Sequence, residues 1–149
     1  MYKKILIATD GSELAGRALE HGLKLAKLVG AEVTILTVTE PAAVVGAGYA
    51  SIAGTMIDPM PELIQAQEDA AKQVLGAAEA AAQAAGVSVK TRLIDNSFPA
   101  EGIVAAAEET SADLIVMGSH GRRGIGRLLL GSQTSNVLAH SKVPVLVTR

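Results

Sequence analysis

Short apolar segments alternate with helix-forming segments along this chain, and that alternation is the strongest constraint on its fold. Five segments are predicted as buried strands, at residues 3–9, 32–39, 87–94, 113–117 and 143–148. Helices are predicted between them, over residues 12–30, 61–85, 99–110 and 132–140. This order predicts an α/β fold, an open doubly wound five-stranded parallel sheet with helices on both faces. At 149 residues, we expect a single domain over residues 1–149.

The composition narrows the chemistry that such a domain can perform. The chain has no cysteine, which excludes thiol nucleophiles, redox pairs, iron–sulfur clusters and thiolate zinc sites. Its three histidines, His21, His120 and His140, are too scattered to suggest a histidine-rich metal site. The composition still allows chemistry that uses carboxylates, hydroxyls, backbone groups or bound phosphates.

Charge is distributed unevenly along the chain. The net charge of −2 and the presence of only three aromatic residues argue against nucleic-acid binding. All 15 acidic residues lie at or before Asp113, accompanied by eight basic residues, which gives that part a charge of −7. The segment from Leu114 to Arg149 has five basic residues and no acid, a charge of +5. We therefore expect the last quarter of the chain to attract anions.

One segment does not follow the alternation. Residues 41–57 contain no charged residue, a pattern that a membrane span could also produce. The segment is shorter than the roughly 20 residues of a spanning helix, begins with proline and contains three glycines, so we predict a flexible loop over residues 41–60. A loop leaving the carboxyl end of the second strand would lie beside a ligand crevice and could act as a flap.

No targeting segment is predicted at the N-terminus. Two lysines precede the apolar run at residues 5–8, but that run ends at Thr9 and Asp10 and is too short for a signal peptide. We therefore expect a cytoplasmic protein that does not enter a membrane.

A glycine-rich segment follows the fourth predicted strand, at the edge where open α/β sheets bind ligands. Five of the 15 glycines lie within residues 117–134. Glycine lets backbone N–H groups approach an anion, and Ser132 is predicted to cap the next helix, whose positive end would face that anion. A flexible turn would explain the glycine count alone. The position and the positive charge favour a phosphate-binding loop.

Two common nucleotide-binding loops are not found in the sequence. No Walker A pattern, G-x-x-x-x-G-K-[ST], is present. The turn after the first strand, Thr9-Asp10-Gly11-Ser12, does not match the G-x-G-x-x-G of dinucleotide-binding folds. Phosphate binding by this chain would therefore require a loop of another kind than these two.

The pattern Gly118-x2-Gly121-x9-Gly131-Ser132 resembles the G-x2-G-x9-G-[ST] signature of the ATP-binding branch of the universal stress protein family. The resemblance extends over the whole chain, from Lys3-Lys4-Ile5-Leu6 and Thr9-Asp10-Gly11-Ser12 to Val143-Pro144-Val145-Leu146-Val147. It implies a Rossmann-like fold of the adenine nucleotide alpha hydrolase-like type. It also implies ATP, or ADP or AMP, as the ligand.

The resemblance implies roles for individual residues around the nucleoside. Ala8 and Thr9 would pass near the base, and Val38 would hydrogen-bond adenine through its backbone. Met117 and Gly118 would lie along the nucleoside.

Asp10 is expected to meet the ribose, or an Mg²⁺ or Mn²⁺ ion held by the phosphates. One carboxylate holds such an ion poorly, so the metal should arrive only with the nucleotide. The remaining expected phosphate contacts come from the glycine-rich segment and are Gly121, Gly131, Ser132, Gln133, Thr134 and Arg122. Two of these residues have alternatives, since Asp10 could be an ordinary turn and cap residue and Arg122 a solvated surface residue.

These observations predict a stress-response protein that binds an adenine nucleotide as a ligand-dependent switch, without efficient turnover. A slow ATPase is the alternative from another class. No general base supports it, because nothing in the sequence supplies an orienting partner for His120. A protein that acts through association alone, with an empty site, is a third interpretation, which the intact glycine pattern disfavours.

The last predicted strand, Val143 to Thr148, is short and apolar and is expected at an edge of the sheet. An unprotected apolar edge tends to pair with another strand. We therefore predict a homodimer through this strand, and the family resemblance points the same way.

Overall fold

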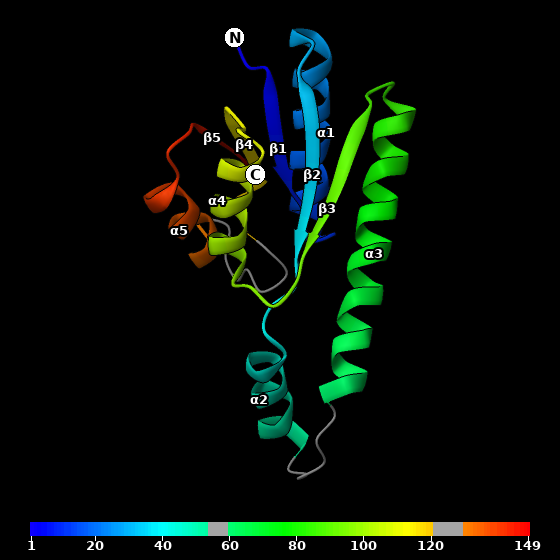
Figure 1. The fold of residues 1–149 in the computed structure, drawn as a ribbon, viewed down its shortest axis with the longest axis vertical. Helices are drawn as coiled ribbons and strands as arrows, with labels where there is room; N and C mark the ends of the chain where they lie inside the picture. The colour runs from blue at the N-terminus through cyan, green and yellow to red at the C-terminus, as the bar shows by residue number, and fades with distance from the viewer. Residues whose placement is uncertain (54–59, 121–129) are drawn as a thin grey trace.

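The computed structural model describes residues 1–53, 60–120 and 130–149, and its centre is one sheet of five parallel strands (Figure 1). The strands are β1 (Lys4–Ala8), β2 (Glu32–Val38), β3 (Val89–Ile94), β4 (Leu114–Gly118) and β5 (Val145–Thr148). They lie in the order β3-β2-β1-β4-β5, and each neighbouring pair is parallel. The predicted sheet is confirmed, and β5 lies at an edge as expected.

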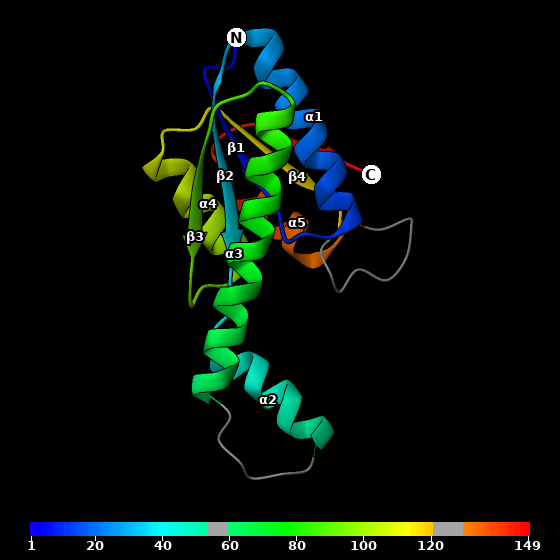
Figure 2. The same cartoon turned by 90° about the vertical axis from the view of Figure 1, so that its right-hand side faces the viewer.

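Helices cover both faces of the sheet, which confirms the doubly wound arrangement (Figures 1 and 2). On one face lie α1 (Glu13–Val29) and α3 (Met60–Ala84). On the other lie α4 (Pro99–Glu109) and α5 (Ser132–His140). Each of these four helices begins and ends within one residue of its predicted bounds.

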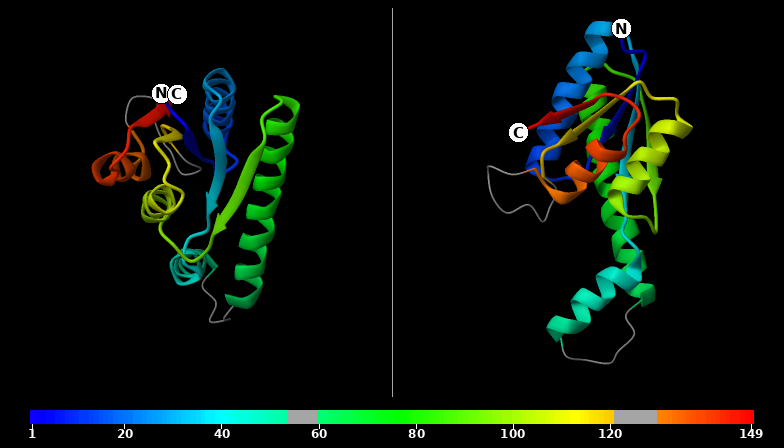
Figure 3. Two further views of the ribbon diagram at one scale, coloured as in Figure 1. Left: turned by 45° about the horizontal axis from the view of Figure 1, so that its top comes forward. Right: turned by 90° about the vertical axis from the view of Figure 1, so that its left-hand side faces the viewer.

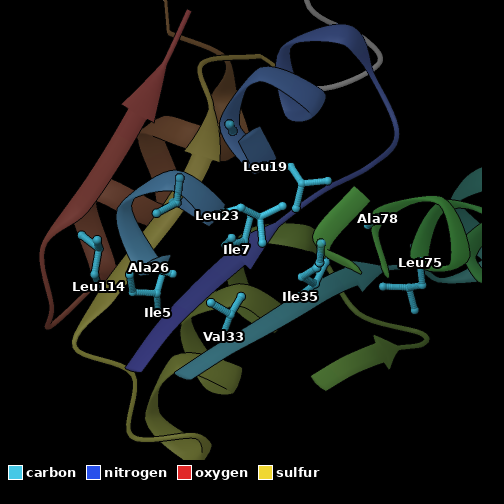
Figure 4. Close-up of a cluster of buried hydrophobic side chains, with 13 residues drawn as sticks. Ile5, Ile7, Leu19, Leu23, Ala26, Val33, Ile35, Leu75, Ala78 and Leu114 are labelled. Carbon is cyan, nitrogen blue, oxygen red and sulfur yellow. The ribbon is translucent and has the colours of Figure 1, made fainter. Parts of the chain in front are cut away.

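Alternate residues of the central strands face opposite sides of the sheet and so build two hydrophobic cores. On β1, Ile5 and Ile7 face α1 and α3, whereas Leu6 faces α4 and α5, and all three are at most 1% exposed. Figure 4 shows the first core, in which Leu19 and Leu23 of α1 lie close to Ile7. Burial on both faces is the reason for the uninterrupted apolar runs in the sequence.

The local sequence sets both ends of helix α1, which starts a few residues after β1. The hydroxyl of Ser12 accepts a hydrogen bond from the Ala15 N–H at 3.3 Å, which caps the first turn. The helix ends at Gly30, whose φ of 69° is left-handed and whose N–H bonds to the Ala26 carbonyl. The chain then enters β2 at Glu32.

The prediction of a flexible loop over residues 41–60 is wrong for its first part. Residues 42–53 form a helix, α2 (Ala42–Ala53), which packs against α3 beyond the end of the sheet (Figure 2). Alanine favours helix, and a helix satisfies its backbone groups internally without needing charged side chains. Two glycines inside the segment did not outweigh that preference. Residues 54–59 lie outside the described residues.

Neither α2 nor any other described helix has the length and apolar character needed to cross a membrane.

Gly22 is where α1 approaches the sheet most closely. A Cβ built there would lie 2.6 Å from Ile7 Cδ1 and 3.5 Å from Val116 Cγ1, and both neighbours are 0% exposed. We expect Gly22→Ala to lower the free energy of unfolding by about 1–2 kcal/mol, because overpacking exceeds the gain in helix propensity. Urea denaturation measures the difference.

Gly16→Ala is the matched control, because a Cβ at Gly16 of the same helix meets nothing within 4 Å. It should raise the free energy of unfolding by about 0.5–1 kcal/mol. Equal effects of the two substitutions would contradict the close contact at Gly22.

Candidate functional site

The strand order changes direction between β1 and β4. The chain runs from β1 outward to β2 and β3 and then returns to place β4 and β5 on the other side of β1. The helices that follow these two central strands, α1 and α5, lie on opposite faces of the sheet (Figures 2 and 3). Open α/β sheets bind ligands at such a switch point, outside the carboxyl ends of the strands. This edge is therefore the candidate site.

The described residues that the sequence assigned to the site gather at this edge. They are Ala8, Thr9 and Asp10 at the end of β1, Val38 at the end of β2, Met117 and Gly118 at the end of β4, and Gly131, Ser132, Gln133 and Thr134 at the start of α5. Gly121 and Arg122 lie outside the described residues.

Backbone and side-chain hydrogen bonds fix the end of β1 against β2. The N–H of Thr9 donates to the Leu36 carbonyl at 2.9 Å, and the hydroxyl of Thr37 donates to the Thr9 carbonyl. Ala8 and Thr9 are each only 8% exposed. Their backbone therefore forms a rigid floor to the crevice.

Asp10 acts as a turn residue, which is the alternative that the sequence offered for it. Its Oδ1 accepts a hydrogen bond from the Ser12 N–H at 2.9 Å, and Ser12 in turn caps α1. Gly11 between them has a φ of 78°, a left-handed conformation that suits glycine. The same turn holds the Asp10 carboxylate at the carboxyl end of β1, half-buried beside the start of α1.

Val38 extends β2 past the end of β1. The last residue of β1, Ala8, is paired with Leu36, so β2 continues two residues further. The next residue, Thr39, donates its N–H to the Ile94 carbonyl of β3 at 2.8 Å. Successive residues of a strand direct their N–H and C=O groups to opposite sides. Val38 therefore directs both groups toward the β1 side, at the mouth of the crevice.

The first turn of α5 is tied to the end of β4. The Thr134 hydroxyl, in a side chain that is 2% exposed, lies 3.0 Å from the Gly118 carbonyl and 3.1 Å from the Ser119 carbonyl and donates to both. The N–H of Gly131 donates to the same Ser119 carbonyl at 2.8 Å. The Gly131 N–H is thus engaged here, whereas the N–H groups of Ser132, Gln133 and Thr134, in the first turn of α5, have no acceptor within their own helix.

The prediction that Ser132 caps α5 is wrong by one residue. The cap position is Gly131, with φ −61° and ψ 154°, and Ser132 is the first residue of the helix. Gly131 and Thr134 both donate hydrogen bonds to the Ser119 carbonyl at the end of β4. These bonds hold Gly131 in the extended cap conformation, so the cap lies one position earlier than the sequence suggested. Within the described residues, this helix start has no side-chain cap hydrogen bond.

Gln133 has a contact that the sequence did not reveal. Its Oε1 accepts a hydrogen bond from the Ala100 N–H in the first turn of α4, at 3.1 Å. The cap residue of α4, Phe98, makes no side-chain cap bond, so Gln133 supplies an acceptor to that turn. The two residues are 33 positions apart, which leaves no local signal for the contact.

Gly118 is required by packing as well as by its place in the glycine pattern. A Cβ at this position would lie 3.1 Å from the Leu14 carbonyl carbon and 3.2 Å from the Ala15 nitrogen. These are backbone atoms of the first turn of α1, which cannot shift as a side chain can. Glycine at the end of β4 therefore lets the start of α1 approach the crevice.

His120 pairs with its sequence neighbour. Its Nδ1 lies 3.2 Å from the hydroxyl of Ser119, a residue that is 2% exposed. No group of three or more His, Asp or Glu residues in the described part of the chain could hold a metal ion.

Two hollows lie at the opposite end of the sheet and contain none of the assigned site residues. One, of about 250 Å³, lies between the end of α4 and the segment before β5. At its edge, Lys142 and Glu108 form an ion pair of 2.7 Å, and this hydrogen bond and the Glu108 charge raise the pKa of Lys142. The other hollow, of about 310 Å³, lies at the amino ends of β1, β2 and β3.

The fold and the residues gathered at the switch point define a doubly wound α/β protein with a candidate ligand site outside the carboxyl ends of its strands. The model of the universal stress protein family matches residues 1–149. The chain belongs to that family.

Curated relatives and solved structures agree with this assignment. The chain is 37% identical over 150 residues to Universal stress protein MJ0531 of Methanocaldococcus jannaschii, covering 100% of this chain and 83% of the relative. The solved structure of MJ0577, from the same organism, aligns with a TM-score of 0.81 at 34% identity, covering 99% and 96% of the two chains. A universal stress protein solved in complex with cAMP aligns with a TM-score of 0.69 at 29% identity, covering 99% and 97%.

Removing the Thr134 hydroxyl tests the tie between α5 and β4. We expect Thr134→Val to lower the free energy of unfolding by about 1–3 kcal/mol, because the buried Gly118 carbonyl loses this donor and the Ser119 carbonyl keeps only the Gly131 N–H. Urea denaturation gives the value. Ser135→Ala, at the exposed neighbouring position, is the control and should stay within about 0.5 kcal/mol of the parent. A Thr134→Val variant as stable as the control would argue against the tie.

Proposed function

We propose that this protein binds an adenine nucleotide, ATP or its product ADP or AMP, in the crevice and acts in the stress response as a nucleotide-dependent switch. The observation that carries the proposal is the start of α5, hydrogen-bonded to the end of β4, together with the end of β2, which extends two residues past β1. The solved relative in complex with cAMP supports an adenine nucleotide in this fold. A cytoplasmic location stays a prediction from the sequence.

The backbone of Val38 suits adenine. The base-pairing edge of adenine offers an acceptor at N1 and a donor at the N6 amino group, which match one N–H and one C=O of a strand. Guanine has the opposite pattern at these positions, with a donor at N1 and an acceptor at O6. Base selection would thus need no side chain, only the correct position of Val38.

Phosphates would bind at the start of α5. The N–H groups of Ser132, Gln133 and Thr134 and the helix dipole favour an anion there. The charge of +5 over the last quarter of the chain adds to the attraction. Gly121 and Arg122 stay predicted phosphate contacts. Asp10 would meet the ribose, or share with the phosphates an Mg²⁺ or Mn²⁺ ion that screens their charge.

A switch fits the described residues better than an ATPase does. The His120 ring pairs with the hydroxyl of Ser119, and no described carboxylate orients it as a general base. Binding would act by ordering the groups around the nucleotide and changing the surface that a partner meets. The slow ATPase and the protein with an empty site stay as alternatives for experiment.

Replacing Ser132 by an acidic residue separates binding from folding. Ser132→Asp puts a negative charge in the first turn of α5, where the helix dipole should raise the free energy of unfolding by about 0.3–1 kcal/mol. The same charge should repel phosphate and weaken ATP binding by about ten-fold or more. Calorimetric titration with ATP and Mg²⁺ measures affinity, and thermal unfolding without ligand measures stability.

Asn136→Asp is the control, because it adds the same charge to an exposed position one turn further along α5. It should leave ATP affinity within about two-fold of the parent. A parent protein whose melting temperature does not rise with ATP and Mg²⁺ would reject nucleotide binding in favour of the empty site. Chromatography of the bound nucleotide after incubation distinguishes a switch, which retains ATP, from an ATPase, which yields ADP.

We also propose a homodimer through the last strand. β5 lies at the sheet edge, and its Leu146 side chain is 38% exposed. The Pro144 and Thr148 carbonyls accept hydrogen bonds from β4, so Val145 and Val147 direct their N–H groups outward. A second copy of β5 could pair with these free groups.

Val147→Pro tests this pairing because it removes an outward N–H and leaves the bonds to β4 in place. We expect the parent to be a dimer and the variant a monomer at micromolar concentration by size-exclusion chromatography with light scattering. Circular dichroism should remain that of the folded parent. A monomeric parent, or a variant that remains dimeric, would exclude dimerisation through this edge.

A further inference from the structure

The start of α4 touches the strand end that carries the proposed base contact. A Cβ built at Gly102 would lie 3.1 and 3.2 Å from the two Cγ atoms of Val38, and 3.3 Å from the Ser97 hydroxyl. Gly102 is buried in the first turns of α4. The helix therefore packs its backbone directly onto the Val38 side chain.

Backbone conformation does not explain a glycine at this position. Among the glycines that the structure describes, those with a left-handed φ are Gly11, Gly30 and Gly86, whereas Gly102 has an ordinary helical backbone. Inside a helix, glycine is less favourable than alanine. Space for Val38 is the reason that the described structure offers for it.

The same turn of α4 is joined to both halves of the crevice. On the base side, the Ser97 N–H donates to the Thr39 carbonyl at 3.0 Å, just after Val38. On the phosphate side, the Ala100 N–H donates to Gln133 Oε1 of α5 at 3.1 Å. The start of α4 therefore sets where β2 ends relative to the start of α5.

We propose that Gly102 is a positioning residue that determines base specificity. The inference rests on the proposed function, adenine-nucleotide binding with Val38 as the base contact. Without a Cβ at residue 102, α4 holds the Val38 backbone where its N–H and C=O meet N1 and N6 of adenine together. A side chain at residue 102 displaces Val38 by a few tenths of an ångström and weakens that paired contact, while leaving the phosphate contacts at α5 in place.

The test compares ATP and GTP binding to the parent and to Gly102→Ala by calorimetric titration. The parent should prefer ATP. In Gly102→Ala, ATP affinity should fall by about ten-fold, because both base hydrogen bonds are weakened together. GTP, which does not form that pair of bonds, should change by less than about three-fold. The ATP/GTP ratio is the decisive readout, because a general loss of stability would lower both affinities alike.

Gly76→Ala is the matched control, a glycine-to-alanine change inside α3 where an added Cβ meets nothing within 4 Å. It should keep the parent ratio. A double-mutant cycle adds a second check, because shortening Val38 to alanine removes the two Cγ atoms that a Cβ at residue 102 would meet most closely. In a Val38→Ala background, Gly102→Ala should then change ATP affinity by less than about two-fold.

The outcomes separate this inference from the proposed function. A parent that binds neither ATP nor GTP rejects nucleotide binding, and the positioning role with it. A parent that prefers ATP, with a Gly102→Ala variant of unchanged ATP/GTP ratio, overturns only the role of Gly102. A ratio that falls in Gly102→Ala but not in Gly76→Ala supports that role.

Discussion

The site depends on one topological constraint, which is that the neighbouring central strands β1 and β4 send their helices to opposite faces of the sheet. Among the described residues, the helices that follow these strands leave the edge between them on opposite faces, which is where open α/β sheets bind ligands. The starts of α1 and α5 lie on either side of this gap and bring two positive helix ends toward it. The chemistry of the site is therefore chiefly that of the backbone, in agreement with a chain that has no cysteine.

The described glycines set distances between elements as well as shaping turns. Gly22, Gly102 and Gly118 each lie where an added Cβ would come within 3.1 Å or less of a neighbour. Those neighbours belong to β1, the end of β2 and the start of α1. The three positions therefore control how closely helices approach the strands around the crevice. A glycine count taken from sequence does not separate this role from phosphate binding.

Most of the fold could be predicted because burial leaves a periodic pattern in the sequence. The strands are apolar on both faces, and the helix starting after Ser12 and ending at Gly30 has its own boundary residues. The edge of the sheet at which the candidate site is placed was predicted from the sheet type alone. Local patterns failed for α2, whose uncharged sequence has no polar face to mark it as a helix. They also misplaced the cap of α5, because the bonds that position Gly131 come from β4.

The contacts that sequence reasoning missed are all between distant segments. Gln133 was predicted at the phosphates, and the structure adds a contact of its side-chain oxygen, which accepts from the Ala100 N–H 33 positions away. The contact of Gly102 with Val38 likewise joins separate elements and has no sequence signal. Such contacts arise only when the layers of the fold come together, so they need coordinates to be seen.

The arrangement of α2 and α3 has a consequence for how such a chain can vary. The two cores draw on α3 only from Ala71 onward, and no described side chain of α2 belongs to either. The hairpin that these helices form projects past the sheet, where few other segments constrain its length (Figure 2). Insertions or deletions of whole helical turns there would leave both cores intact. This hairpin is thus where the domain can gain or lose sequence in evolution, and where an engineer could attach a label.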